Sequence, residues 1–462
     1  MSIHVLILAA GKGTRLKSAL PKVLHQVAGA PMIDYVLATA AAIGAETRTV
    51  VVGHEADRVR AALGGQDDLR FVVQEPQLGT AHAVIQAEPL FAGARGTLVV
   101  LPGDAPLLTA KTLRALLDRH EQTGAAATVL AAVVDNPYGY GRIVREGDEV
   151  VRIVEHRDAS ASERAIREVN SSIYAFDVEP LFPALRQVAS DNAQKEYYLP
   201  DLVAIYRKEG RRVAALAIDR PDEILGINTR AELAAMSERV WDARRAALMA
   251  AGVTLEDPRT TYIDRDVLVG PDSVIRPGVT LQGRTRIGAR ATIHSGVRIV
   301  DSELADDVTI LDHCLVTGAR IAQGAAVGPF AHIRPDSNIC AGARVGNFVE
   351  LKKTTLGAGS KANHLAYLGD ATIGEKVNIG AGTITCNYDG VRKNPTVIED
   401  GVFIGSDSQL VAPVTIGRGA YVAAGSTITK DVPADALGIA RSRQENKEGW
   451  AALKKRLLKA EK

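Results

Sequence analysis

The sequence of 462 residues has little cysteine and no excess of charge of either sign, and each shortage excludes classes of protein. Its three cysteines, Cys314, Cys340 and Cys386, are odd in number and far apart, so they predict neither a disulfide framework nor a CxxC metal site. They fit a reducing, intracellular setting best. The 55 Lys and Arg residues balance 54 Asp and Glu residues. This balance argues against nucleic acid or an anionic membrane as a partner, because both favour a strongly basic surface.

Long apolar runs and aromatic residues are also scarce. No apolar run approaches the roughly 18–20 residues of a membrane span. The first residues lack a basic segment and reach Gly11 after a short apolar run, so we expect no signal peptide. Aromatic residues make up 4% of the chain, whereas glycine occurs 42 times. The organisation of the second half accounts for both values, as described below.

The first half, up to about Asn228, alternates short apolar runs with helical patterns. The expected elements are buried strands at Val5–Leu8, Val50–Val52, Phe71–Val73 and Leu98–Leu101, and a helix at Met32–Ile43. This alternation predicts a mostly parallel sheet covered on both faces. Because ligands bind outside the carboxyl ends of the strands in such sheets, the loops after Leu8 and Leu101 should matter for function.

A long helix is expected after this half. Thr229 and Glu232 have the spacing of a capping box, and Gly252 is a plausible stop. We interpret residues 231–251 as a helix that connects a domain of residues 1–230 to a domain of residues 252–462. The alternative is one more helix of the first domain.

From Ile263 onward, apolar residues recur every six positions. Apart from four shifts of phase, before Leu304, Ile321, Leu356 and Ile373, the series continues to Ile379. Small residues follow four positions after many of these anchors, for example Ser273, Thr285, Ala291, Ala325, Ser337, Ala343 and Ser360. A hexapeptide repeat of this length is typical of a β-helix. Its tight corners leave no room for aromatic side chains inside and need glycine at the bends.

The repeat is interrupted once, at Thr385–Pro395. We expect it to resume with Val397, Phe403, Val411 and Ile416. A loop that leaves a solenoid is usually functional. At the end of the chain, within Glu445–Lys462, the residues Trp450, Leu453, Leu457 and Leu458 share one face of a predicted helix, which we interpret as a solvated packing helix.

The loop after the first strand has the character of a phosphate-binding loop. It reads Leu-Ala-Ala-Gly-Lys-Gly-Thr-Arg-Leu from Leu8 to Leu16, and glycine N–H groups with Lys12 and Arg15 suit a triphosphate. It is neither a Walker A loop, since no Gly-Lys-Ser/Thr follows at the required spacing, nor a dinucleotide loop, since Leu16 replaces the third glycine. Lys22 adds a second cation. A tight structural turn is the alternative interpretation.

The loop after Leu101 carries Asp104 between glycine and proline residues. Such an aspartate is usually a turn former. At the carboxyl end of a parallel strand, opposite a phosphate loop, it becomes a candidate Mg²⁺ ligand.

In the repeat half, charged and aromatic residues gather in one window. It contains Arg334, Asn347–Lys353, Asn363–Asp370, Asn378–Thr383 and, in the interrupting loop, Asn387 and Tyr388. Within this window His364 is a candidate general base, with a surface histidine as the alternative, and Arg334 and Lys352 are cations that could hold a phosphate.

These motifs resemble a known family. The loop from Leu8, followed by Pro21-Lys22, is similar to that of sugar-nucleotide pyrophosphorylases, as are Gln74–His82, Tyr140–Arg142, Ile153–Ala159, Asn170 and Gly226–Asn228. With the hexapeptide half, essentially the whole chain resembles the bacterial bifunctional N-acetylglucosamine-1-phosphate uridyltransferases/glucosamine-1-phosphate N-acetyltransferases. The resemblance implies an α/β, Rossmann-like nucleotidyltransferase domain, a connecting helix and an all-β, left-handed parallel β-helix.

The resemblance also implies the residues of a first site. The uridine and sugar-nucleotide ligands would be Leu8, Ala9, Ala10, Gly11, Lys22, Gln74, Gly79, Thr80, Pro102, Gly103, Asp104 and Asn228, with Gly141, Glu155 and Asn170 at the N-acetylglucosamine part. Asp104 and Asn228 would hold Mg²⁺. Arg15 and Lys22 would stabilise an in-line attack of the sugar phosphate on the α-phosphorus of UTP. Two departures, Pro102 in place of a common Tyr and Ser172 in place of a common Gly, are expected to change substrate contacts slightly without loss of activity.

For a second site, the resemblance implies that His364 accepts the proton. The sugar-phosphate ligands would be Arg334, Lys352, Tyr367 and Asn378, and the acetyl-CoA ligands Ala381, Asn387, Tyr388, Ser406, Ala424 and Arg441. Members of this fold assemble as homotrimers with acetyl sites between subunits.

The sequence therefore predicts a cytoplasmic bifunctional enzyme, without nucleic acid or membrane partners. It would acetylate glucosamine-1-phosphate from acetyl-CoA and couple the resulting N-acetylglucosamine-1-phosphate to UTP, which makes a precursor of peptidoglycan and lipopolysaccharide. One alternative is a single-activity nucleotidyltransferase whose β-helix only oligomerises. Another is a non-enzymatic scaffold, which would leave Lys22, Asp104 and Asn228 without a role.

Overall fold

The computed structural model describes residues 2–64 and 68–460, and the chain folds into two compact units, Met1–Trp241 and Asp242–Lys462. Residues 1 and 462, the outer limits expected for the two domains, lie outside the described residues. The expected limits at residues 230 and 252 remain a prediction.

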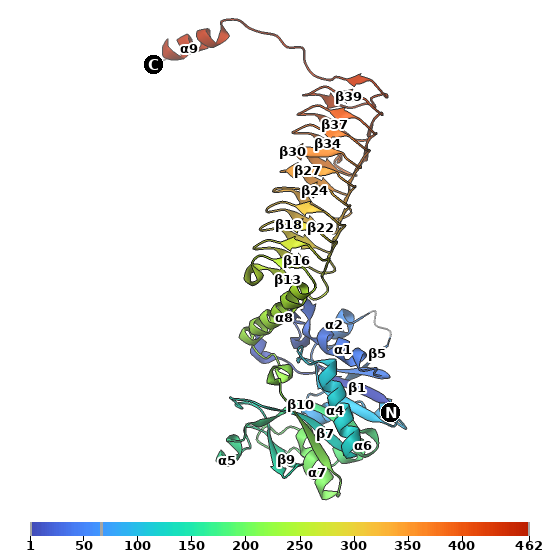
Figure 1. Cartoon of the computed structure of the whole chain (residues 1–462), viewed down its shortest axis with the longest axis vertical. Coiled ribbons are helices and arrows are strands. Elements are labelled where there is room, and N and C mark those ends of the chain that lie inside the picture. Colours follow the sequence, from blue (N-terminus) through green and yellow to red (C-terminus); the bar gives the residue numbers. More distant parts are fainter. Residues whose placement is uncertain (1, 65–67, 461–462) are drawn as a thin grey trace. The chain divides into compact units, whose positions relative to one another are not determined.

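One large sheet forms the centre of the first unit, with the strand order β11-β7-β10-β6-β1-β4-β5 (Figure 1). Its strands are β1 (Ile3–Leu8), β4 (Thr47–Val52), β5 (Leu69–Val73), β6 (Thr97–Pro102), β7 (Ala127–Val133), β10 (Glu168–Asp177) and β11 (Val213–Ile218), and the hairpin of β8 (Arg142–Glu146) and β9 (Glu149–Val154) joins β10. Only β10 runs antiparallel to its neighbours in the main order, so the expected mostly parallel sheet is confirmed for the described residues. The expectation that Phe71–Val73 is fully buried is wrong, because β5 lies at the edge and pairs with β4 alone.

Helices cover both faces of this sheet. One face packs against α1 (Met32–Ala42), α2 (Ala56–Ala62) and α4 (Ala110–Thr123), and the other against α3 (Thr80–Ile85), α6 (Val178–Leu185) and α7 (Leu202–Lys208). Each face of the sheet has its own hydrophobic core, and alternate residues of β1 point into the two cores: Val5 and Ile7 into one and Leu6 into the other. The short helix α5 (Ala161–Arg164), the small pair β2 (Gln26–Val27) and β3 (Ala30–Pro31), and five 3₁₀ turns (Thr14–Leu16, Lys22–Leu24, Glu88–Phe91, Leu199–Asp201 and Pro221–Ile224) complete the described part of this unit.

The expected long helix is α8 (Arg230–Ala250), and the division between the units falls within it. The Thr229 hydroxyl accepts the Glu232 N–H at 3.2 Å, and the Glu232 carboxylate accepts the Thr229 N–H at 3.2 Å, so the predicted capping box is present. Gly252, with φ +90°, ends the helix as predicted.

The second unit is the β-helix expected from the repeat (Figure 1). Each strand from β12 to β37 pairs in parallel with the strand three places further on, and β39 pairs with β41. Sheet 1 contains β12 (Thr254–Leu255), β15 (Val274–Ile275), β18 (Thr292–Ile293), β21 (Thr309–Ile310), β24 (Ala326–Val327), β27 (Arg344–Asn347), β30 (Lys361–His364), β33 (Asn378–Ile379), β36 (Phe403–Ile404), β39 (Tyr421–Val422) and β41 (Leu437–Gly438). Sheet 2 contains β13 (Tyr262–Ile263), β16 (Thr280–Gln282), β19 (Arg298–Val300), β22 (Leu315–Thr317), β25 (His332–Ile333), β28 (Glu350–Lys352), β31 (Tyr367–Gly369), β34 (Ile384–Cys386), β37 (Gln409–Val411) and β40 (Thr427–Ile428). Sheet 3 contains β14 (Leu268–Val269), β17 (Arg286–Ile287), β20 (Glu303–Leu304), β23 (Arg320–Ile321), β26 (Asn338–Ile339), β29 (Thr355–Leu356), β32 (Ala371–Ile373), β35 (Thr396–Ile398) and β38 (Val414–Ile416). A 3₁₀ turn at Pro258–Thr260 precedes β13.

The repeat anchors form the core of this unit. From Ile263 to Ile379 they are buried, except that Val269 in the first coils is only partly covered. The small residues that follow the anchors are buried too, and hydroxyls among them bond the backbone of the next coil: Ser360 Oγ donates to Gly374 O at 2.7 Å and accepts from Val377 N at 2.9 Å. Each anchor is therefore followed by a second inward position, which holds a small side chain in many coils and a valine in others, for example Val279 and Val297.

After the interrupting loop, the predicted phase is wrong by one residue. The buried residues are Ile398, Ile404 and Leu410, whereas the expected anchors Phe403 and Val411 are 41% and 36% exposed. Val397, between two buried neighbours in β35, also points away from the core, and only Ile416 was placed correctly. The loop itself starts later than expected, since β34 continues to Cys386. A loop of arbitrary length carries no information about the phase in which the repeat resumes.

The C-terminal helix α9 (Trp450–Ala460) forms where a helix was predicted, but its apolar face stays largely exposed. Trp450, Leu453, Leu457 and Leu458 are each more than half exposed. The expected packing role is therefore wrong for the described residues of the single chain. Among these residues, no helix combines the length and the apolar character of a membrane span.

Candidate active sites

The glycine loop follows β1 at the carboxyl edge of the sheet. Leu8 O accepts the N–H of Gly103 at 2.9 Å, which brings the two loops singled out in the sequence side by side. Gly13 has φ +59°, and a Cβ built on it would lie 2.7 Å from the Cβ of Lys22. Only glycine at position 13 therefore lets the Lys22 side chain pass close to the loop.

Four predicted residues from distant segments meet beside this loop. Lys22 Nζ forms an ion pair with Asp104 and donates to Asn228 Oδ1 at 2.8 Å, and Arg15 Nη2 donates to the same oxygen at 2.8 Å. The Lys22 and Asp104 side chains are each 17% exposed, so water screens this pair only partly. The cluster presents two fixed cations to an incoming anion.

Asp104 and Asn228 also fit a divalent cation. A carboxylate and an amide oxygen are ligands that Mg²⁺ prefers, and both side chains already converge on one cation, the Lys22 ammonium. Among the described residues, no group of three or more His, Cys, Asp or Glu side chains could hold a metal. The remaining ligands of an ion held by Asp104 and Asn228 would therefore have to come from phosphate oxygens and water.

A cleft of about 640 Å³ opens next to this cluster. Its walls include Arg15, Pro102, Asp104, Asn170 and Asn228 among the predicted residues, together with Tyr138, Tyr140, Ser172, Glu232 and Arg239. Polar and aromatic walls of this kind suit a sugar or a base.

Gly141, Glu155 and Asn170 form a second group. A Cβ built on Gly141 would lie 3.2 Å from Glu155 Oε1 and 3.5 Å from the Asn170 Cβ, so Gly141 leaves room between the two side chains. Burial, reinforced by the charges of Asp158 and Asp201, raises the pKa of Glu155.

Ser172, one of the two departures from the family pattern, has φ +62°. Its N–H donates to Asn170 Oδ1 at 3.0 Å, which orients the Asn170 amide. This backbone conformation explains why glycine is common at the position in the family that the sequence resembles. The other departure, Pro102, ends β6 opposite Leu8, where the missing N–H does not disturb the bond between Gly103 and Leu8.

Gln74, Gly79 and Thr80 occupy the loop between β5 and α3. The Gln74 side chain is buried, and its Nε2 donates to Gly79 O at 2.9 Å. Gly79 has φ +115°, and a Cβ there would lie 2.5 Å from Tyr197 O. Thr80 Oγ1 accepts the N–H of Leu199 at 3.0 Å. These contacts hold the loop at the same edge of the sheet as the glycine loop.

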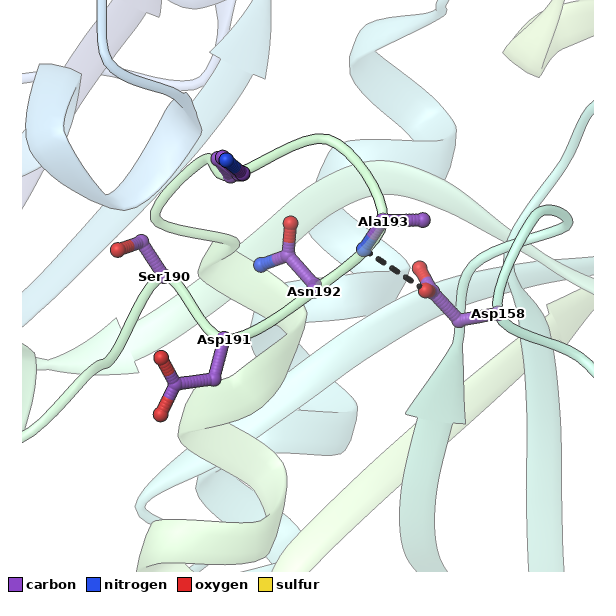
Figure 2. A pocket seen from close by; sticks show the side chains of 6 residues that line it. Asp158, Ser190, Asp191, Asn192 and Ala193 are labelled. Atoms are coloured by element: carbon purple, nitrogen blue, oxygen red, sulfur yellow. Dashed lines mark hydrogen bonds between the residues drawn. The ribbon is translucent and has the colours of Figure 1, made fainter.

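A further open cavity of the first unit, of about 480 Å³, contains none of the predicted residues. Figure 2 shows its lining residues Asp158, Ser190, Asp191, Asn192 and Ala193, with the Ala193 N–H donating to Asp158 Oδ1 at 3.1 Å. An adjoining cavity of about 360 Å³ shares Asp158, Asp191 and Asn192 and includes Glu155.

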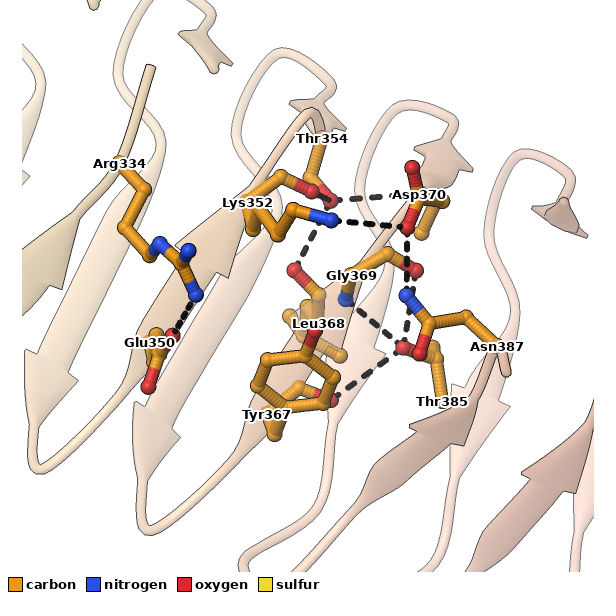
Figure 3. Close-up of polar contacts among 11 residues, drawn as sticks. Arg334, Glu350, Lys352, Thr354, Tyr367, Leu368, Gly369, Asp370, Thr385 and Asn387 are labelled. Atoms are coloured by element: carbon orange, nitrogen blue, oxygen red, sulfur yellow. Dashed lines mark hydrogen bonds and ion pairs between the residues drawn. The ribbon is translucent and has the colours of Figure 1, made fainter. Parts of the chain in front are cut away.

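In the second unit, several predicted residues gather on sheet 2 (Figure 3). Lys352 Nζ lies 3.5 Å from Asp370 Oδ2, and Asn387 Nδ2 donates to the same oxygen. Arg334 Nη1 donates to Glu350 Oε1 at 2.9 Å on the neighbouring coils. The predicted cations are thus each held by a carboxylate that the sequence did not single out as a site residue.

Tyr367 and Asn387 both lie over Gly369. A Cβ built there would approach Tyr367 Oη to 2.5 Å and Asn387 Nδ2 to 2.7 Å, so a larger residue would displace both side chains. The Gly369 N–H donates to the buried Thr385 Oγ1 at 2.7 Å.

The sequence also did not single out Lys393, on the interrupting loop. The proximity of Lys352, and to a smaller extent the charge of Arg334, lowers the pKa of Lys393, because like charges disfavour its protonated form. Arg334, Lys352 and Lys393 thus form a cationic group suited to a phosphate. The loop's departure from the repeat was the signal in the sequence that pointed towards it.

The predicted proton acceptor and three of the six predicted acetyl-CoA ligands form a column at the end of the strands of sheet 1. Strands β30, β33, β36 and β39 pair in register, so His364, Ala381, Ser406 and Ala424 occupy equivalent positions on successive coils. Arg441 Nη1 donates to Ala424 O at 2.8 Å at one end of the column. With a spacing of about 4.8 Å between strands, the column from His364 to Ala424 is roughly 14 Å long.

Two predicted ligands lie apart from these groups within the single chain. Asn378 lies on sheet 1, whereas Lys352 and Tyr367 lie on sheet 2. Tyr388 is 59% exposed on the loop, and its hydroxyl donates to Gly390 O at 2.6 Å.

Comparison with known proteins follows the same division of the chain. Residues 5–199 match the model of the MobA-like NTP transferase domain, and residues 395–430 match that of the bacterial transferase hexapeptide of six repeats. The chain is 52% identical to the bifunctional protein GlmU of Trichlorobacter lovleyi, over 98% of both chains. It is 51% identical to that of Brevibacillus brevis, over 97% of both, and 47% identical to that of Streptococcus thermophilus, over 98% of both.

Proposed function

Because this chain belongs to the family of bifunctional GlmU proteins, we propose which residues of each unit carry its two activities, uridylyl transfer and acetyl transfer. The chain is a transferase of cell-wall synthesis that acts on sugar phosphate, UTP and acetyl-CoA and needs a divalent metal. We assign Mg²⁺ as the metal and UDP-N-acetylglucosamine as the final product. The observation that carries the assignment of residues is that each unit has its own cluster of the kind its reaction requires.

In the first unit, the phosphate oxygen of N-acetylglucosamine-1-phosphate attacks the α-phosphorus of UTP. A new P–O bond forms, the bond to the bridging oxygen breaks, and pyrophosphate leaves with the electron pair. Arg15 and Lys22 lie where they can stabilise the charge that develops, which is the main demand of phosphoryl transfer. Asp104 and Asn228 would hold Mg²⁺, which neutralises phosphate charge when bound. Gly141, Glu155 and Asn170 would contact the sugar.

In the second unit, the amine of glucosamine-1-phosphate attacks the thioester carbonyl of acetyl-CoA. The C–N bond forms, the C–S bond breaks, CoA leaves as the thiolate, and His364 takes the proton from the amine. Arg334 and Lys352, with Lys393, would hold the sugar phosphate. The exposed small residues Ser406 and Ala424 leave a track for acetyl-CoA that ends at Arg441, a suitable partner for a coenzyme phosphate.

We also propose a homotrimer with acetyl sites between subunits. This proposal is supported by the position of the sugar-phosphate ligands, because Asn378 lies on sheet 1 whereas Lys352 and Tyr367 lie on sheet 2. In a trimer, sheet 1 of one copy could face sheet 2 of the next copy and bring Asn378 close to Lys352. Phe330 and Phe348 stack at 5.7 Å and are 50% and 57% exposed, which gives a copy an apolar surface to cover. We place the reaction in the cytoplasm, where the free thiols of Cys314, Cys340 and Cys386 would stay reduced.

A product assay by phosphorus NMR tests the proposal. The full-length protein receives glucosamine-1-phosphate, acetyl-CoA, UTP and Mg²⁺, and each reagent is omitted in turn. UDP-N-acetylglucosamine should form only in the complete mixture. Conversion of preformed N-acetylglucosamine-1-phosphate alone would overturn the acetyl site and favour a β-helix that only oligomerises.

Two variants serve as controls for each other. Asp104→Ala should reduce uridylyl transfer by about 100-fold or more and leave acetyl transfer intact. His364→Ala should reduce acetyl transfer by a factor of about 10²–10⁴ and leave uridylyl transfer intact. Loss of both activities in either folded variant would contradict the two-site assignment.

A further inference from the structure

The strands that carry His364 and its neighbour Asn347 depart from the regular repeat. β27 (Arg344–Asn347) and β30 (Lys361–His364) each contain four residues, whereas every other described strand of sheet 1 contains two. The extra length adds one register pair, Asn347 with His364. In sheet 1, the paired segments of β27 and β30 are therefore extended as far as His364.

Gly346 makes this pairing possible. A Cβ built on Gly346 would overlap the carbonyl group of Asn363 on the next coil. Any other residue would push the two coils apart and separate Asn347 from His364. The close approach of the two coils at Gly346 therefore places Asn347 next to His364, and their contact does not depend on the side-chain conformations alone.

The contact has a definite direction. His364 Nδ1 and Asn347 Oδ1 lie 2.8 Å apart. A carboxamide oxygen can only accept, so the proton lies on Nδ1 and the imidazole donates. A neutral imidazole carries one ring proton, which leaves Nε2 with a free lone pair.

We propose that Asn347 is a positioning residue for acetyl transfer: it holds His364 in the tautomer whose Nε2 can accept the proton of the attacking amine. This inference rests on the proposed role of His364. The amide is neutral, so it fixes the tautomer and the ring plane without adding a charge that would favour the imidazolium form.

Charged groups on the strands around β30 do not replace this contact. The ionisable residues of the paired and adjoining strands are Arg344 on β27, Glu350 and Lys352 on β28, Lys361 on β30 and Tyr367 on β31, and β33 contributes none. Glu350 accepts a hydrogen bond from Arg334 Nη1 at 2.9 Å, so its carboxylate already has a cationic partner. The position in register with His364 on the following coil is Ala381, which offers no side-chain acceptor. Beyond the corner, on sheet 2, Lys352 is paired with Asp370.

Kinetics of three full-length variants test the proposal. Asn347→Ala should lower kcat of acetyl transfer by about 10–100-fold, with the KM values of both substrates and uridylyl transfer unchanged. Asn347→Asp keeps an acceptor and should retain most of kcat, but its carboxylate should move the acidic limb of the pH profile up by about one unit. Asn338→Ala, an exposed asparagine on sheet 3, is the matched control and should behave as wild type.

A readout independent of turnover is the rate at which diethylpyrocarbonate modifies His364, followed by mass spectrometry. This reagent attacks an unprotonated ring nitrogen, and the exposed His54 of the first unit serves as internal reference. His364 should react faster than His54 in the wild type and in Asn347→Asp, and lose this advantage in Asn347→Ala.

The inference is overturned if Asn347→Ala matches Asn338→Ala in kcat and in the modification rate. Failure of the proposed function would look different: His364→Ala would then keep full acetyl transfer, whatever the reactivity of its neighbours. A general loss of folding in Asn347→Ala would be detected as altered KM values and altered exposure of the reference histidine.

Discussion

Replacement of Ser172 by glycine should stabilise the first unit. Ser172 has φ +62°, its side chain is exposed and forms no hydrogen bond with another described residue, and its backbone N–H donates to Asn170 Oδ1. The substitution therefore removes no side-chain contact. What it changes is the energy of a left-handed backbone conformation, which a Cβ makes unfavourable.

The magnitude follows from two opposing terms. A residue with a Cβ in the left-handed region costs about 1–2 kcal/mol relative to glycine, whereas the greater freedom of glycine in the unfolded chain costs about 0.4–1 kcal/mol. At the midpoints of these ranges, about 1.5 and 0.7 kcal/mol, the net gain is about 0.8 kcal/mol. For a unit of this size, it should raise the midpoint of thermal unfolding by roughly 1–4 °C.

The assay is the temperature of half-inactivation of uridylyl transfer, with acetyl transfer of the same samples as the reference for the second unit. Ser172→Ala is the matched control, because it removes the hydroxyl and keeps the Cβ. The glycine variant should gain stability and the alanine variant should not. Equal shifts in both variants would refute the argument from backbone conformation.

Three further predictions concern other residues of the two sites. Gly79→Ala should lower the free energy of unfolding of the first unit by about 1–3 kcal/mol and raise the KM for UTP, because the new Cβ would overlap Tyr197 O. Urea unfolding measures the first effect and initial rates measure the second. A free energy of unfolding and a KM equal to those of the wild type would contradict the contact. Burial raises the pKa of Glu155 in the folded unit above its ordinary value of 4.5, so the folded unit binds the carboxyl proton more tightly than the unfolded chain does. The free energy of unfolding should therefore fall as pH rises from 4.5 through the raised pKa of the folded unit. Glu155→Gln should remove that fall, which urea midpoints measured from pH 4.5 to neutral pH would test, and an unchanged slope would contradict it. Arg441→Ala should raise the KM for acetyl-CoA about tenfold without affecting uridylyl transfer, and an unchanged KM would remove Arg441 from the coenzyme site.

Much of the fold could be predicted because its signals are local. Buried strands and helical patterns alternate along the first half, and the capping box at Thr229 marks the start of α8. The six-residue period of the second half is equally local, since successive coils repeat the same inward positions, an apolar anchor followed in many coils by a small side chain or a valine.

The errors lie where local signals end. The interrupting loop breaks the count of the repeat, so Phe403 and Val411 were assigned to the core in place of Ile404 and Leu410. An apolar run such as Phe71–Val73 does not tell whether a strand has one neighbour or two. Both are decided by pairing partners that are distant in the sequence.

The candidate sites divide in the same way. The sequence by itself determined the types of residue, through the glycine loop, the aspartate after a buried strand and the polar window around His364. Only the tertiary structure decided that Lys22 lies between Asp104 and Asn228, and that Asn347 is in register with His364. The physical reason is that a hydrogen bond or an ion pair requires a separation of about 3 Å, and only the packing of whole strands and coils brings residues so far apart in the chain to that distance.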